Sequence, residues 1–124
     1  MAKCDEGYLC EVCGGDVATL SESDLYLRYV IGLLDPEVLH TTPERHVRCN
    51  PALAQYIIAG GFPPVECLGA FDKRLLDSEF VSEREALVTR GYLRLRELEG
   101  AGEAIINYPL PEVLERIKQR SATT

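Results

Sequence analysis

The chain has 124 residues, of which 46% are hydrophobic and 27% charged, and its formal net charge at pH 7 is −7. This composition is typical of a single globular domain. It holds no apolar run near the roughly 18 residues of a membrane span, and its acidic balance disfavours broad binding to the phosphate backbone of nucleic acids.

The N-terminal residues MAKCDEGYLC are acidic and lack the apolar core of a signal peptide, so we expect a cytoplasmic protein. Thiols stay reduced in the cytoplasm, where closely spaced cysteines bind metals more often than they form disulfides. The chain has five cysteines, and an odd number fits poorly with a closed set of disulfides.

Three glycines and two prolines in residues 60–70 predict a hinge, because neither residue type continues a helix or a central strand well. We therefore predict one α+β domain over residues 1–124. Residues 1–59 form a cysteine-rich, metal-binding half, and residues 71–124 form a helical half that packs against it.

The first expected element lies between residues 24 and 32, where leucine, tyrosine and isoleucine alternate with other residues. A period of two with aromatic and β-branched residues favours a strand. The alternative is a short helix capped by Ser21 or Ser23, because the segment is apolar nearly all round.

Two helix-start signals follow. Thr42 precedes Pro43, and Asn50 precedes Pro51, so that each pair offers an N-cap residue and a proline at the first helical position. Pro51 disfavours helical backbone at Asn50, which predicts two short pieces in place of one long helix.

The clearest periodicity runs from Ser78 to Glu99 and predicts a long amphipathic helix. The alternative is a hairpin within residues 91–108, where leucines also alternate with arginines. A last helix is expected from Pro111 to Arg120. The buried stripe of the long helix should contain Phe80, Val81, Leu87, Val88, Gly91, Tyr92, Leu95 and Leu98.

Arg84 projects near the middle of this apolar stripe, where an unpaired charge is costly. Its aliphatic stem can pack while its guanidinium reaches solvent. Alternatively, the guanidinium pairs with an acid on the first half or on a partner.

The stretch CEVCGG, with Cys10 and Cys13, carries the strongest functional signal. Two cysteines two residues apart suit a tetrahedral zinc ion, and the following glycines let backbone N–H groups turn back toward the sulfur. The stretch resembles the zinc knuckle of zinc ribbons and treble-clef domains. The resemblance covers about seven residues and implies a metal-binding turn in a knuckle-like first half.

A closed zinc site needs four ligands. His46 and Cys49 are three residues apart and precede a helix start, where treble-clef domains supply their second pair, so the predicted ligands are Cys10, Cys13, His46 and Cys49. Cys4 could replace His46 and create an all-sulfur site. Four thiolates would also make an iron–sulfur cluster chemically feasible.

The two other residues with ligand chemistry are expected to lie elsewhere. Cys67 stands alone in the hinge, where an ordinary small packing residue is expected. His40 is expected to make a polar contact. A redox role for CEVCGG is disfavoured, because a redox dithiol sits at a helix start and the glycine pair is poor there.

The sequence therefore predicts a small accessory or adaptor protein with a structural zinc ion, which binds another protein or its own copy. Four protein ligands leave no open position for catalysis, and no residue pattern argues for an enzyme. Two alternatives stay open. One is a redox or metal sensor that uses thiolates or an iron–sulfur cluster, and the other is a zinc-dependent nucleic-acid-binding protein.

Overall fold

The computed structural model describes residues 8–122, and about half of the chain is helical. Strands β1 (Tyr8–Leu9) and β2 (Asp16–Val17) pair antiparallel, with Tyr8 opposite Val17. The α-helices are α1 (Asp24–Val30), α2 (Pro51–Ala54), α3 (Ser78–Leu98) and α4 (Pro111–Ala122). Short 3₁₀ helices cover Leu20–Glu22, Pro36–Val38, Val47–Cys49, Lys73–Leu75 and Ile105–Asn107.

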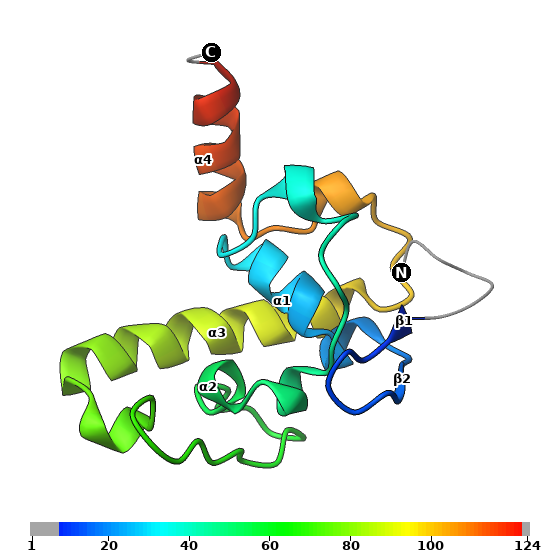
Figure 1. Cartoon of the computed structure of the whole chain (residues 1–124). Coiled ribbons are helices and arrows are strands. Elements are labelled where there is room, and N and C mark those ends of the chain that lie inside the picture. The colour runs from blue at the N-terminus through cyan, green and yellow to red at the C-terminus, as the bar shows by residue number, and fades with distance from the viewer. Residues whose placement is uncertain (1–7, 123–124) are drawn as a thin grey trace.

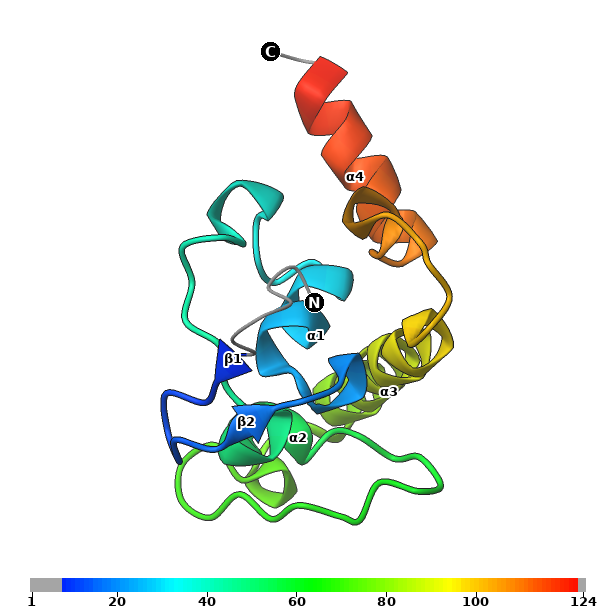
Figure 2. The ribbon, with the colours of Figure 1, turned by 90° about the vertical axis from the view of Figure 1, so that its right-hand side faces the viewer.

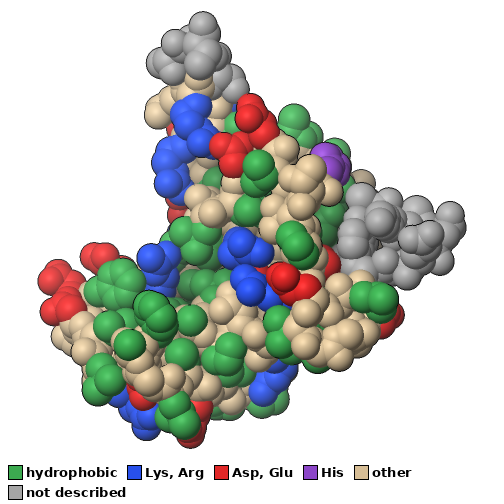
Figure 3. Space-filling view, viewed as in Figure 1, with side chains coloured by type: hydrophobic (Ala, Val, Ile, Leu, Met, Phe, Trp, Pro, Cys, Tyr) green, Lys and Arg blue, Asp and Glu red, His purple; other side chains and the backbone are tan. Residues whose placement is uncertain are grey.

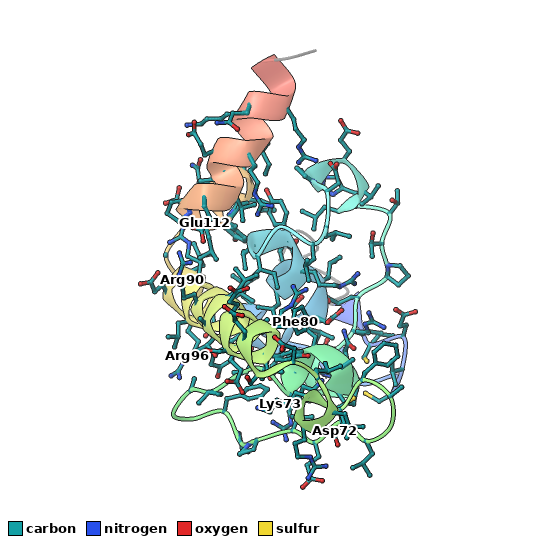
Figure 4. All side chains as sticks on the ribbon, turned by 90° about the vertical axis from the view of Figure 1, so that its left-hand side faces the viewer. Asp72, Lys73, Phe80, Arg90, Arg96 and Glu112 are labelled. Atoms are coloured by element: carbon teal, nitrogen blue, oxygen red, sulfur yellow. The ribbon has the colours of Figure 1, made fainter. Side chains whose placement is uncertain are left out.

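Helix α3 runs across the molecule in Figure 1, with α1 packed against it and α2 drawn below it. The β1–β2 hairpin lies at one end of the body, and α4 extends away from the body (Figures 1 and 2). Arg90 of α3 and Glu112 of α4 face each other in Figure 4 and form an ion pair of 2.6 Å. Within residues 8–122 no helix has both the length and the apolar character to cross a membrane.

The strand predicted between residues 24 and 32 is wrong, and the alternative helix is present as α1. Ser23 is its N-cap, and its hydroxyl oxygen accepts a hydrogen bond of 3.0 Å from the Tyr26 N–H. Six of the seven α1 residues are buried, so apolar side chains occur on nearly every face of the helix. The alternation that favoured a strand therefore reflects burial on all sides and not a pleat.

The long helix is confirmed as α3, and the hairpin alternative is wrong, since residues 91–98 continue the helix. The carboxylate of Asp77 caps it by accepting hydrogen bonds from the N–H groups of Glu79 and Phe80. The predicted stripe is buried only in its C-terminal part, at Val88, Gly91, Tyr92, Leu95 and Leu98.

Gly91 lies where α3 crosses α1. A Cβ atom at this position would overlap Ile31 Cγ2 and lie 3.0 Å from Leu27 Cδ1. The glycine thus allows the close approach of the two helices. Apolar side chains from before and after the hinge share one buried cluster around this crossing, including Leu27, Ile31, Val88 and Leu95.

The two helix starts predicted in the first half differ in outcome. No helix begins at Pro43, because residues 43–46 instead form extended backbone with a bridge between His46 and Ser23. Helix α2 does begin at Pro51, yet it has only four residues, and the Asn50 side chain does not cap it. The final helix is confirmed as α4, and residues 60–70 contain turns and irregular backbone.

Candidate metal centre

The structure brings together Cys10, Cys13, His46 and Cys49. One ligand atom from each residue lies within 4.8 Å of all the others, so the four residues are close enough to hold a metal ion. The described part of the chain has no other such group of histidine, cysteine or carboxylate side chains. Cys4, the alternative ligand on which the iron–sulfur cluster depends, lies outside the described residues.

Cys10 and Cys13 lie on the turn that joins β1 to β2. The turn closes through two backbone hydrogen bonds, from the Cys10 N–H to the Gly15 carbonyl at 2.8 Å and from the Gly14 N–H to the Cys10 carbonyl at 2.9 Å. Gly14 has a φ of 77°, which a side chain would strain. The second glycine has the role expected from the sequence, because its N–H points at Cys13 Sγ at 3.4 Å.

His46 and Cys49 come from a second, separate segment. His46 immediately precedes the 3₁₀ helix Val47–Cys49, and the helix closes through a 3.0 Å hydrogen bond from the Cys49 N–H to the His46 carbonyl. One helical turn therefore places the two side chains on the same side of the backbone. The spacing in the sequence was sufficient to predict this pair.

The imidazole of His46 is oriented for metal binding. Its Nε2 atom lies 2.8 Å from the Asp16 carbonyl oxygen, so Nε2 carries the proton and donates it. Its Nδ1 atom then faces the sulfurs of Cys13 and Cys49, at 3.3 and 3.9 Å. Metal-binding histidines characteristically use their second ring nitrogen in this way, which fixes the tautomer and the ring plane.

Backbone hydrogen bonds join the two ligand segments directly. The Glu11 N–H donates to the Glu44 carbonyl at 2.9 Å, and the His46 N–H points at Cys10 Sγ at 3.3 Å. These contacts hold the two segments in register, so the arrangement of the four ligands does not depend on side-chain contacts alone.

A buried acid anchors the second segment to α1. The Asp24 carboxylate is fully buried and accepts hydrogen bonds from Arg28 Nε and Arg45 Nε, both at 2.9 Å, and from Asn50 Nδ2 at 2.8 Å. The Asp24 N–H donates to the Arg45 carbonyl. Arg45 and Asn50 flank the ligands His46 and Cys49, so this network positions both ends of the ligand segment.

Glu44 adds a second buried carboxylate to the same region. It accepts a 2.8 Å hydrogen bond from the Ser23 hydroxyl and one of 3.0 Å from the Arg45 N–H. Burial raises the pKa of Glu44, and the nearby Asp24 charge acts in the same direction. The sequence indicates neither the anchoring contacts of Asp24 nor the buried hydrogen bonds of Glu44, because no local pattern distinguishes one acid among twenty.

The electrostatics of the cluster favour a cation. Burial by itself would raise the pKa of the Cys10 thiol, but hydrogen bonds from the backbone N–H groups of Cys13, His46 and Val12 lower that pKa to about 6. At neutral pH Cys10 is therefore a thiolate before any metal binds, and it supplies negative charge to the cluster.

The two partly buried ligands, Cys49 and His46, respond to that charge by holding protons. Burial, together with the hydrogen bonds and charges of Cys10 and Cys13, raises the pKa of Cys49 to about 11. Burial would lower the pKa of His46, but the Asp16 carbonyl and the two sulfurs raise it to about 9. A metal cation would replace these protons as the positive charge among the sulfurs.

The remaining candidates lie apart from the cluster. His40 is exposed on the loop after the 3₁₀ helix Pro36–Val38, and Cys67 is a partly buried free thiol in the hinge. Neither residue belongs to the group of four ligands that the described part of the chain brings together.

No model of a protein family, no curated protein and no solved structure matches this chain. The geometry of the four ligands is therefore the main evidence for a function.

Proposed function

We propose that Cys10, Cys13, His46 and Cys49 bind one structural Zn²⁺ ion, and that the protein is a small adaptor that acts by binding another protein. The observation that carries the metal assignment is the convergence of the four ligand atoms within 4.8 Å. Two of the observed separations, 3.3 and 3.9 Å, suit a tetrahedron with zinc bonds of about 2.0–2.3 Å.

The donor set favours zinc among the common metals. Three sulfurs and one imidazole nitrogen are soft and borderline ligands, which suit Zn²⁺ and do not suit Mg²⁺ or Ca²⁺. The turn that carries Cys10 and Cys13 resembles a zinc knuckle. Four protein ligands complete the tetrahedron and leave no position for a substrate or an activated water, so the ion would stabilise the fold.

The adaptor role is supported by what surrounds the site. A structural ion that joins residues 8–17 to residues 44–50 gives rigidity to a region with little regular secondary structure. Several large apolar side chains remain exposed on the described residues, among them Leu68, Phe71 and Leu75. Exposed apolar groups beside polar ones are typical of protein interaction surfaces.

Elemental analysis of the purified chain, followed by cobalt substitution, tests the metal assignment. We expect one equivalent of zinc, and a Co²⁺ spectrum with strong visible bands of a tetrahedral site with sulfur ligands. An iron content with visible absorption would instead support the iron–sulfur alternative, and a chain that binds no metal would overturn the proposal.

Cross-linking in the native cells, followed by purification of the tagged chain, tests the adaptor role. We expect one protein to be recovered in a near-stoichiometric amount with the wild-type chain. Recovery of the chain alone would contradict an adaptor role and leave the zinc site unaffected.

One observation favours a second function, that of a redox sensor. Cys13 is exposed, and Cys49 borders an open cavity of about 720 Å³, so an oxidant can reach both sulfurs. Reversible release of zinc by a low concentration of hydrogen peroxide, restored by a thiol reductant, would support this function. Retention of zinc under the same treatment would exclude it.

A further inference from the structure

An open groove of about 330 Å³ lies between α1, α2 and the start of α3, and Asn50, which follows the ligand Cys49 and precedes α2, is part of its lining. Its walls are mainly apolar and include Leu33, Leu53, Tyr56, Phe71, Leu76 and Phe80. Figure 3 shows hydrophobic side chains gathered over the N-terminal half of α3, with basic and acidic side chains at the border. Figure 4 shows Phe80 near the point where α3 passes α2.

Leu53 and Tyr56 are buried in the groove wall, whereas Leu33, Phe71 and Phe80 are exposed. The side chain of Phe71 is 70% exposed and that of Phe80 is 41% exposed. Phe80 begins the apolar stripe of α3, whose C-terminal part is buried against α1. The stripe thus continues beyond its buried part into an open groove, which is the pattern of a helix face that a partner covers.

The charged groups that line the groove are both basic. Arg28 and Arg84 contribute to its lining, whereas no aspartate or glutamate does. Arg28 already donates from Nε to the buried Asp24 carboxylate. Arg84 has no acidic partner among residues 8–122, and its guanidinium lies over the Phe80 ring, 5.2 Å from the ring centre.

We infer that this groove binds an apolar segment of a partner protein that carries an acidic residue, and that the carboxylate of this residue pairs with Arg84. The inference rests on the proposed adaptor function and names its surface. Charge complementarity identifies the occupant, because Arg84 has no acidic partner among residues 8–122 and no acid lines the groove, on a chain whose net charge is −7. A second copy of so acidic a chain would be repelled at long range.

The geometry suits a carboxylate. The guanidinium of Arg84 is held over an aromatic face, so less of its conformational freedom is lost on binding. Its planar donors can bind both oxygens of a carboxylate, and partial removal from water strengthens that bond. The aromatic walls would supply most of the affinity, and Arg84 would select acidic segments.

Panning a displayed library of random 12-residue peptides against the zinc-loaded chain tests this inference. We expect the enriched peptides to combine aromatic or aliphatic residues with Asp or Glu. In binding assays with the best peptide, Arg84→Glu should weaken the affinity about tenfold, because it replaces an attraction by a repulsion. Lys118→Glu, on an exposed part of α4, is the matched control with the same charge change and should leave the affinity unchanged.

A second pair of variants tests the apolar wall without disturbing the core. Phe71→Ser removes an exposed ring from the groove and should also weaken binding about tenfold, whereas Ile106→Ser removes a 73% exposed side chain outside the groove lining and should not. Zinc content and thermal unfolding of each variant show that the fold is retained. Chemical-shift changes on peptide binding should be largest at Leu33, Leu53 and Phe80.

Three outcomes would overturn the inference. They are enrichment of peptides without acidic residues, equal effects of Arg84→Glu and Lys118→Glu, and self-association through the groove that Arg84→Glu abolishes. The adaptor function fails separately, when the wild-type chain recovers no partner from cross-linked cells. If the wild-type and Arg84→Glu chains recovered the same partner equally well, the adaptor function would stand, and only the assignment of its surface to the groove would be refuted.

Discussion

The metal-ligand region, comprising residues 8–17 and 44–50, and the crossing of α1 with α3 are stabilised by different forces. At the crossing, buried aliphatic side chains such as Leu27 and Leu95 pack around Gly91. The metal-ligand region has two-residue strands and one 3₁₀ turn, and Val17 and Val47 are its only buried aliphatic residues in the described part of the chain. Asp24 and Glu44 bind backbone and side-chain donors there.

This difference shows how a small chain without tryptophan can order a segment that has few apolar residues. Where apolar burial is available, helices pack and need no further support. Where it is not, buried hydrogen bonds fix the backbone, and the proposed metal ion would add to the free energy of folding. We expect the two regions to respond differently to metal removal, to substitution and to pH.

The largest expected effect follows loss of a metal ligand. Cys13→Ser should lower zinc affinity more than about 100-fold, because even residues that only orient ligands contribute 10–100-fold. Amide hydrogen exchange should accelerate in residues 8–17 and 44–50, whereas α3 should keep its protection. Cys67→Ser, which changes a free thiol outside the cluster, is the control and should alter neither measurement. Equal loss of protection in α3 would contradict the distinction between the two regions.

Next in size is removal of the buried charge that connects the regions. Asp24→Asn should lower the free energy of unfolding by about 3 kcal/mol, because Arg28 and Arg45 lose a fully buried partner. Urea unfolding of the zinc-loaded protein measures this change. As a control, Asp35→Asn removes a half-exposed carboxylate 3.4 Å from Arg120 and should cost less than about 0.5 kcal/mol. Similar costs for the two variants would show that the Asp24 network has no special role.

The metal affinity should also depend steeply on pH. In the metal-free chain the pKa of His46 is raised to about 9 and that of Cys49 to about 11, so both hold a proton at pH 7 that zinc must displace. Affinity should therefore fall as pH falls, by at least about 100-fold per unit for two protons. Below about pH 6, protonation of Cys10 adds to the fall.

Competition with a chromophoric chelator between pH 8 and 5 measures this dependence. Proton release on zinc binding, recorded with a pH indicator in weak buffer at pH 7, provides an independent check. If zinc binding at pH 7 released one proton or fewer, His46 or Cys49 would not be a ligand.

The smallest predicted effect concerns the helix crossing. Gly91→Ala should destabilise the protein by about 1–2 kcal/mol, because the new methyl group would overlap Ile31 at the crossing. On an exposed helix surface, alanine is more stable than glycine by about 1 kcal/mol. The reverse change at an exposed position of α3, Ala86→Gly, should therefore destabilise the protein. Thermal unfolding shows whether Gly91→Ala lowers or raises the stability of the protein. Raised stability would contradict close packing at the crossing. Zinc affinity should not change in either variant.

The sequence was sufficient where the determining contacts are local. The glycines after Cys13 predicted a turn in which a glycine N–H group points at the Cys13 sulfur. The three-residue spacing predicted that His46 and Cys49 lie together. Periodicity predicted α3 over 21 residues, because one face of that helix is exposed along most of its length. The fold around the metal-ligand region was predicted less well, since its short elements have almost no periodicity to detect.

Only the tertiary structure decided the features that depend on distant residues. The segment Asp24–Val30 is a helix because it is enclosed by α3 and by residues near Leu110, and burial on all sides removes the amphipathic pattern from its sequence. Their spacing in the sequence was enough to predict Cys10, Cys13, His46 and Cys49 as candidate metal ligands. Their approach to within 4.8 Å depends on backbone contacts across more than 30 residues and on the Asp24 network. Residue types and local spacing therefore determined which side chains could bind a metal, and long-range packing determined that they meet.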